Sequence, residues 1–99
     1  MDLQLKNKTV LITGSSKGIG FALAKTLAAE GCDIGICASN ADEVSAAVEA
    51  VQALGVKAHG QVVDVTDSAS LEGWIKACAE ALGGIEGFVA NVSAGGADN

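Results

Sequence analysis

The sequence predicts an α/β fold in which helices cover both faces of a parallel sheet, giving three layers. Short apolar runs rich in β-branched residues alternate with longer helical patterns, which is typical of successive β-α-β units. Hydrophobic residues make up 49% of the chain but aromatic residues only 3%, so we expect a core of Val, Ile, Leu and Ala. The length of 99 residues suits one small domain, residues 1–99.

The first strand and the turn after it organise the rest of the chain. Residues 9–13 are predicted as a buried strand because Val10-Leu11-Ile12 is a short apolar run. The turn reads Thr13-Gly14-Ser15-Ser16-Lys17-Gly18-Ile19-Gly20, and a helix is expected from about Gly18 to Glu30. A helix start offers unpaired N–H groups and the positive end of the helix dipole. This stretch therefore predicts an anion site suited to a pyrophosphate.

The glycine spacing in this turn is G-x-x-x-G-x-G. It is neither the G-x-G-x-x-G of the commonest dinucleotide turn nor a P-loop, because Lys17 is not placed as that motif requires. Glycine permits a tight turn and leaves no Cβ in the way of a phosphate. The alternative interpretation is an ordinary tight turn between strand and helix that binds no ligand.

The second strand is expected at Asp33–Ala38, and a second helix follows it. A capping box is possible with Ser39 and Asp42 or with Asn40 and Glu43. The helix carries one apolar face and ends at Gly55; that face comprises Val44, Ala47, Val48, Val51 and Leu54.

The third strand is expected at Ala58–Val63, directly before Asp64. Thr66 or Asp67 caps a third helix. The apolar stripe of that helix comprises Leu71, Ile75, Cys78 and Leu82, with Trp74 beside it and Gly83-Gly84 at its end. The fourth strand is expected at Ile85–Asn91, followed by a small-residue loop over Val92–Gly96.

Right-handed crossovers leave few arrangements of the strands, and among these we expect a sheet of about four strands in the order 3-2-1-4. In such a sheet a ligand binds at the carboxyl ends of the strands, beside the point where the strand order reverses. The glycine turn, Ser39, Asp64 and Asn91 all lie at such ends. Their convergence predicts one ligand site.

The charge and the cysteine content of the chain argue against several classes of function. A net charge of −6 disfavours a nucleic-acid partner. Cys32, Cys37 and Cys78 lack the spacing of a metal site or a disulfide framework, and they fit buried thiols in a reducing cytoplasm. His59 has no neighbouring ligand and is expected to be structural, so no metal is predicted. No apolar run is long enough for a membrane span.

Three landmarks resemble the short-chain dehydrogenase/reductase family, in its N-terminal, cofactor-binding half: Thr13–Gly20, Val63-Asp64-Val65 and Val89–Gly95. The resemblance implies a half-Rossmann fold and an oxidoreductase that moves a hydride between NADP(H) and a carbonyl or alcohol. It implies that the turn residues Gly14, Ser15, Ser16, Lys17, Gly18, Ile19 and Gly20 hold the pyrophosphate side of the cofactor. It also implies that Asp64 accepts from the adenine amino group and that Val65 lies against the ring.

The third landmark departs from the family pattern. Family members usually read Asn-Asn-Ala-Gly there, whereas this chain reads Ala90-Asn91-Val92-Ser93. The resemblance implies that Asn91 braces the sheet and the ribose side of the cofactor, but a plain turn residue is the alternative. For Asp64 the alternative is a cap of the next helix.

The choice of nicotinamide nucleotide is expected to favour NADP over NAD. NAD-binding members place an acidic residue at the end of the second strand, where this chain has Ala38 followed by Ser39. Lys17 matches the basic residue that NADP-binding members often carry before the second glycine. A second basic residue, often found at the Ser39 position, is absent, and Lys17 could instead be a solvated surface lysine.

The catalytic Ser, Tyr and Lys of the family lie beyond the fourth strand, and this chain contains no tyrosine. We therefore assign no catalytic residue and expect a truncated chain that is inactive alone. An uncovered fourth strand predicts self-association through its edge or through the uncovered apolar face beside it. The alternatives are a non-catalytic nucleotide-binding module, or a non-functional fragment. A small flavodoxin-like or receiver domain is disfavoured because Asp33 opens its strand rather than ending it, and because the first strand ends in Thr13-Gly14.

Overall fold

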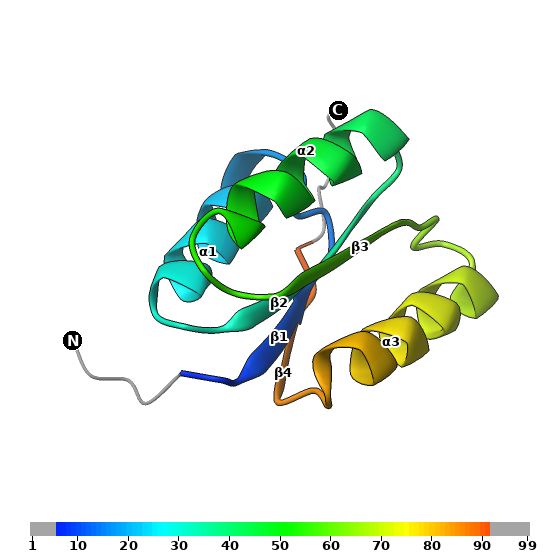
Figure 1. Ribbon diagram of the computed structural model, residues 1–99. Helices are drawn as coiled ribbons and strands as arrows, with labels where there is room; N and C mark the ends of the chain where they lie inside the picture. The colour runs from blue at the N-terminus through cyan, green and yellow to red at the C-terminus, as the bar shows by residue number, and fades with distance from the viewer. Residues whose placement is uncertain (1–5, 92–99) are drawn as a thin grey trace.

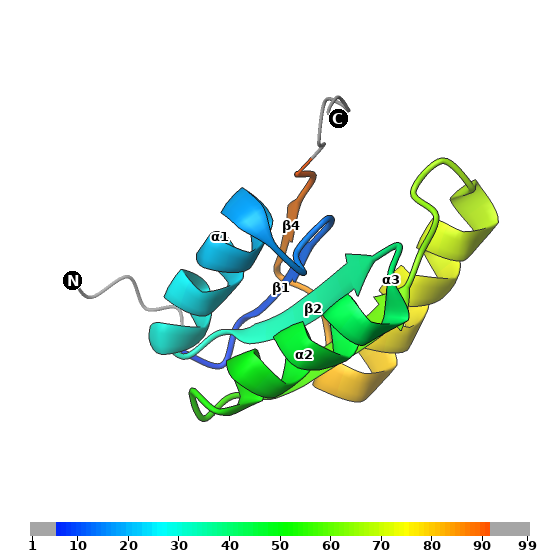
Figure 2. The same cartoon turned by 90° about the horizontal axis from the view of Figure 1, so that it is seen from above.

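The computed structural model describes residues 6–91 and confirms the predicted three-layer architecture. The elements are β1 (Thr9–Ile12), α1 (Gly18–Ala29), β2 (Asp33–Ala38), α2 (Ala41–Gln52), β3 (Ala58–Val62), α3 (Ser68–Leu82) and β4 (Gly87–Val89). All strand pairs are parallel, in the order β3-β2-β1-β4. Figures 1 and 2 show α1 and α2 on one face of the sheet and α3 on the other. Expectations for residues 1–5 and for the loop Val92–Gly96, with Ser93, lie outside the described residues.

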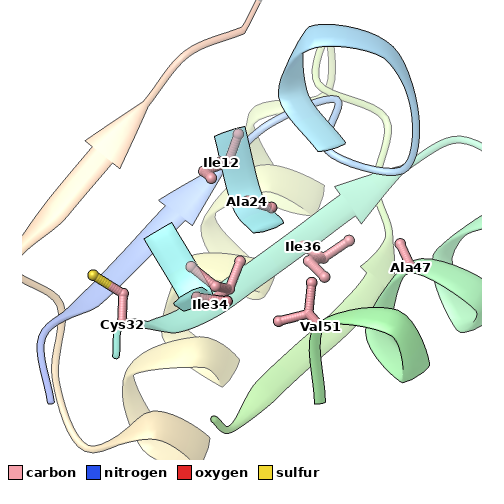
Figure 3. Packing of buried hydrophobic residues seen from close by; sticks show 8 residues of the cluster. Ile12, Ala24, Cys32, Ile34, Ile36, Ala47 and Val51 are labelled. Atoms are coloured by element: carbon pink, nitrogen blue, oxygen red, sulfur yellow. The ribbon is translucent and has the colours of Figure 1, made fainter. Parts of the chain in front are cut away.

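The core under α1 and α2 forms because alternate strand residues face the same side of the sheet. Ile34 and Ile36 of β2 point to this face together with Ile12 of β1, and Figure 3 shows them packed against helix residues. Small alanines on α1 and α2, such as Ala24 and Ala47, let the helices approach closely. The full set of buried residues is Ile12, Ala24, Ala28, Cys32, Ile34, Ile36, Ala47 and Val51.

A second core lies between the sheet and α3, and Trp74 stands at its centre. Trp74 is fully buried with Leu11 and Cys78, whereas Leu71 and Ile75 are only partly buried. The buried face of α3 is therefore rotated about the helix axis relative to the apolar stripe that the sequence predicts, because Trp74, the largest side chain of α3, is the most deeply buried. The Trp74 ring meets Phe88 of β4 edge-on, with centroids 6.3 Å apart.

Several boundaries differ from those the sequence predicts. β4 covers only Gly87–Val89 rather than residues 85–91, because its ladder with β1 extends only from Val10 to Ile12. β1 and β3 each end one residue earlier than expected, and α1 ends at Ala29. Leu54, expected on the buried face of α2, is 45% exposed because the helix already ends at Gln52.

Because the strands are parallel, their carboxyl ends meet at one edge of the sheet, and each helix starts beyond that edge. No helix within residues 6–91 has the length and apolar character needed to span a membrane. The same residues contain no group of three or more His, Cys, Asp or Glu side chains that could hold a metal ion.

Candidate functional site

The glycine turn after β1 is shaped by close backbone contacts. An added Cβ at Gly20 would lie 2.3 Å from the Gly14 carbonyl oxygen, so only glycine lets α1 pack on the turn. Gly14 adopts φ +61°, and its added Cβ would lie 3.1 Å from the carbonyl oxygen of Asn91. These two glycines are therefore required by the internal packing of the turn.

Gly18 differs from the other two glycines because it faces open space. It adopts φ +64°, and within the described residues no heavy atom lies within 4 Å of an added Cβ, apart from its chain neighbours and the adjoining backbone of α1. A backbone that is bare of side-chain atoms on this side leaves room for a ligand to approach the start of α1.

The start of α1 is also left open. Lys17 precedes it in extended conformation and, among the described residues, gives it no side-chain cap, and its first turn holds no acidic residue. Ile19 in that first turn is 82% exposed. The first N–H groups of a helix have no intrahelical partner, so an anion would satisfy them and the helix dipole together.

Asn91 braces this turn from the end of β4. Its backbone N–H donates to Thr13 Oγ1 at 2.9 Å, and its Nδ2 donates to the Gly14 carbonyl oxygen at 3.2 Å. The Thr13 N–H in turn donates to the Val89 carbonyl at 3.1 Å. Sequence reasoning gave Thr13 no separate role, and its position directly before the first glycine was the available signal.

Ser15 is turned into the protein. Its hydroxyl donates to the Ile12 carbonyl at 2.7 Å and accepts from the Cys37 N–H at 3.2 Å, and its side chain is fully buried. The Ser15 hydroxyl thus joins the ends of β1 and β2. The Ser15 N–H also donates to the Cys37 carbonyl at 3.1 Å, so both its hydroxyl and its N–H are engaged within the protein.

Ser16 and Lys17 face α2 instead. The Ser16 hydroxyl donates to Glu43 Oε1 at 3.3 Å, and Lys17 Nζ lies 3.7 Å from Glu43 Oε2. Sequence reasoning missed Glu43 at this site, although it had singled out the spacing of Asn40 and Glu43 as a capping box. Ser39, directly after β2, is exposed.

Asp64 and Val65 lie in the turn after β3, at the far strand of the sheet. Asp64 Oδ1 accepts from the Thr66 hydroxyl at 2.6 Å and from the Thr66 N–H at 2.9 Å. These bonds, the hydroxyl one foremost, hold the pKa of the Asp64 carboxyl below its ordinary value. Val65 is 54% exposed and offers an apolar surface beside it. Asp64 does not cap α3, because Asp67 does.

The chain matches the short chain dehydrogenase family over residues 8–99. Galactitol 2-dehydrogenase of Agrobacterium fabrum is 38% identical over 92 residues, a match that covers 92% of this chain and 34% of that protein. A glycine betaine reductase of Emericella nidulans is 40% identical over 86 residues, covering 87% of this chain and 7% of its own length.

Solved structures give the same result. The L-sorbose reductase of Gluconobacter frateurii, complexed with NADPH and L-sorbose, matches 93% of this chain with a TM-score of 0.88 and 31% identity. An NAD⁺-bound xylitol dehydrogenase matches 86% of it with a TM-score of 0.82 and 30% identity. The chain spans 35% and 33% of those two chains, about a third of each.

Proposed function

The chain belongs to the short-chain dehydrogenase family, and from this premise we propose that it supplies the dinucleotide-binding part of an oxidoreductase acting on a carbonyl or alcohol. The bound nicotinamide would supply or accept the hydride. The observation that carries the proposal is the uncapped start of α1 with Gly18 facing open space. In this proposal the N–H groups at that start bind the pyrophosphate.

The other site residues fit the remaining parts of the cofactor. Asp64 would accept from the adenine amino group, and the exposed Val65 would cover the ring. Asn91 would act by holding the turn in place through Thr13 and Gly14. An Asp64 carboxyl that stays ionised to low pH, as its lowered pKa implies, remains an acceptor across the physiological range.

We propose that NADP is preferred to NAD, and only modestly. Lys17 is a cation within the glycine turn, and Ala38 places no carboxylate at the end of β2. The Lys17 side chain is 79% exposed, so a contact with a 2′-phosphate would be worth at most about 1 kcal/mol and would weaken with salt. The two structural relatives described above carry one nucleotide each, NADPH and NAD⁺.

The proposal is tested by titrating the purified protein calorimetrically with NADP⁺ and NAD⁺. Gly18→Ala should weaken binding of both, since a methyl group would project toward the pyrophosphate. Gly55→Ala is the matched control, because Gly55 also has positive φ and open space but lies beyond the far end of α2. Equal binding by wild type and both variants, or no binding by wild type, would overturn the proposal.

We propose that these residues bind cofactor but do not turn over substrate alone. General acid catalysis contributes about 10²–10⁴-fold, and the chain has no tyrosine to donate the proton. NADPH oxidation with a panel of ketones and aldehydes should stay at the background rate. A non-catalytic nucleotide-binding module would give the same kinetics, but tight binding of AMP with no added affinity for the nicotinamide half would favour that module.

We also propose that the chain self-associates. Within residues 6–91, β4 pairs with β1 alone, which leaves its other edge unpaired, and Phe88 is 46% exposed. A groove of about 550 Å³ on α3 is lined by Ala69, Glu72, Gly73, Ile75, Lys76 and Ala79. Sedimentation should show concentration-dependent association that Phe88→Asp reduces. A stable monomer at all concentrations would contradict this.

A cytoplasmic location is proposed from the thiol chemistry. Cys37 and Cys78 are free and buried. Burial, with Cys37 as a neighbour, raises the pKa of Cys78 to about 12, so its thiol stays protonated at neutral pH. Fractionation of cells that express the protein should recover it with the cytoplasm, and recovery from a secreted or membrane fraction would contradict the proposal.

A further inference from the structure

Glu43 occupies the third position of α2, and only half of its capping box is formed as the motif describes. Its backbone N–H donates to Asn40 Oδ1 at 2.9 Å, which fixes the start of the helix. In a capping box the carboxylate would reach back to the cap residue. Here it contacts Ser16 and Lys17 instead, residues that are 27 and 26 positions earlier in the chain.

The contacted residues form the last part of the glycine turn before α1. Ser16 donates through its hydroxyl and Lys17 through its ammonium group, and both kinds of group bind phosphate oxygens as readily as carboxylate oxygens. The Glu43 carboxylate therefore already holds the donors that an anion at this corner would need. An incoming phosphate would have to displace it and would then meet a like charge.

The exposure of these groups makes such an exchange possible. The side chains of Lys17 and Glu43 are 79% and 40% exposed, so their ion pair is weak and can be opened at little cost. A neutral ribose hydroxyl would have the opposite effect, because it can donate to the carboxylate without displacing it.

We propose that Glu43 determines specificity at this corner, favouring a free 2′-hydroxyl over a 2′-phosphate and so limiting the NADP preference that Lys17 confers. The inference rests on the dinucleotide function proposed above. Lys17 and Glu43 then act as opposed determinants within one ion pair. The balance between these two side chains then sets the ratio of the affinities for NADP and NAD. The residue at the end of β2 does not set this ratio alone.

The test measures affinities for matched nucleotide fragments, with and without the Glu43 charge. The purified protein is titrated calorimetrically with 2′,5′-ADP and 5′-AMP, and then with NADP⁺ and NAD⁺. Glu43→Gln keeps the backbone cap and the size of the side chain. It should raise the ratio of 2′-phosphate to 2′-hydroxyl affinity by about three- to five-fold, the range expected for an exposed pair.

Asp42→Asn is the matched control. Asp42 is exposed in the same first turn, so this variant makes the same change in net charge and in the field at the helix start. It should leave the ratio unchanged, and circular dichroism checks that both variants fold. In a Lys17→Gln background, Glu43→Gln should change the affinity ratio less than it does in the wild type. Without Lys17 the Glu43 carboxylate has no ammonium group to withhold from a phosphate.

The outcomes separate this inference from the function beneath it. If all ligands bind but Glu43→Gln leaves the ratio unchanged, or Asp42→Asn changes it equally, Glu43 has no specific role. If none of the nucleotides binds wild type or variants, the dinucleotide function itself is wrong and the inference falls with it.

Discussion

The three helices found within residues 6–91 begin at the same edge of the sheet, yet their starts are built differently. At α2 the Asn40 side chain accepts from the Glu43 N–H, and at α3 Asp67 Oδ1 accepts from the N–H groups of Ala69 and Ser70. At α1 the preceding Lys17, within the described structure, provides no such bond. All three helix dipoles point in the same direction, so the difference lies in which group accepts hydrogen bonds from the free N–H groups of the first turn.

This difference separates starts that support the fold from one that is available for binding. A side-chain cap stabilises a helix by about 1 kcal/mol, so leaving α1 uncapped carries a cost that α2 and α3 avoid. The same turn uses glycine at Gly18, where φ is +64° and the space beyond is open. Both features make sense together if a ligand anion completes α1, as proposed above.

The largest expected effect concerns the packing of α1 on its own turn. Gly20→Ala would bring a methyl group within 2.3 Å of the Gly14 carbonyl oxygen, a backbone atom that cannot move aside cheaply. We expect destabilisation of about 3 kcal/mol. Gly73→Ala in α3 is the matched control, since nothing lies near its added Cβ, and it should stabilise by about 1 kcal/mol. Urea denaturation measures both, and equal signs would refute this account of the turn.

The next effect tests a capped start. Asp67→Ala removes the side chain that accepts from two N–H groups of α3, and it should lower the free energy of unfolding by about 1 kcal/mol. Asp67→Asn should retain most of the stability, because an amide oxygen caps nearly as well. A loss in Asp67→Asn as large as in Asp67→Ala would mean that Asp67 acts through its charge and not through the cap.

The sequence was sufficient to predict the architecture. The periodicity of apolar residues located the strands and helices of residues 6–91. The right-handed crossover rule left few arrangements, and the order β3-β2-β1-β4 expected among them is the one observed. Asn40 and Asp67, each one of two predicted caps, are the caps observed. The extent of β4 could not be predicted, because it depends on how many β1 residues remain to pair with it.

The candidate site was predicted only in part. Local motifs identified the glycine turn, because its conformation follows from glycine and from neighbours in sequence. The pairing of Glu43 with Ser16 and Lys17 joins residues from two different β-α connections. Such a contact depends on the packing of α1 against α2, which no sequence spacing reports. The inward orientation of Ser15 depends likewise on the alignment of β1 with β2.

A smaller effect is expected when α1 is given the cap it lacks. Lys17→Asn places an amide acceptor at a position that already has the extended backbone of a cap residue, so it should stabilise the unliganded protein by about 0.5–1 kcal/mol. Lys17→Ala removes the same charge without adding a cap. The Asn variant should therefore be the more stable of the two but the weaker binder of dinucleotide. Thermal unfolding and calorimetry measure the pair, and identical stability would show that this start cannot be capped.

The smallest effect is expected in the turn after β3, where the Asp64 carboxylate accepts two hydrogen bonds from the nearby Thr66. The Thr66 hydroxyl is the main cause of the lowered Asp64 pKa, and the Thr66 N–H is the second. Thr66→Ala removes the first and keeps the second, so the pKa should rise toward 3.8 without reaching it. NMR titration of the side-chain carboxyl carbon measures this, with Thr26→Ala as control because that hydroxyl bonds Ala22 within α1.

The sign of the accompanying stability change follows from the direction of that shift. A carboxyl that is more acidic in the folded chain stabilises the fold above its ordinary pKa of 3.8, and the contribution disappears as pH falls through the lowered value. Thr66→Ala should therefore cost more stability at neutral pH than in acid. The effect stays small because Asp64 is exposed to solvent. An unchanged Asp64 pKa in Thr66→Ala would mean that the Thr66 hydroxyl does not bind the Asp64 carboxylate. The turn after β3 would then have no more side-chain hydrogen bonding from Thr66 than the start of α1 has from Lys17.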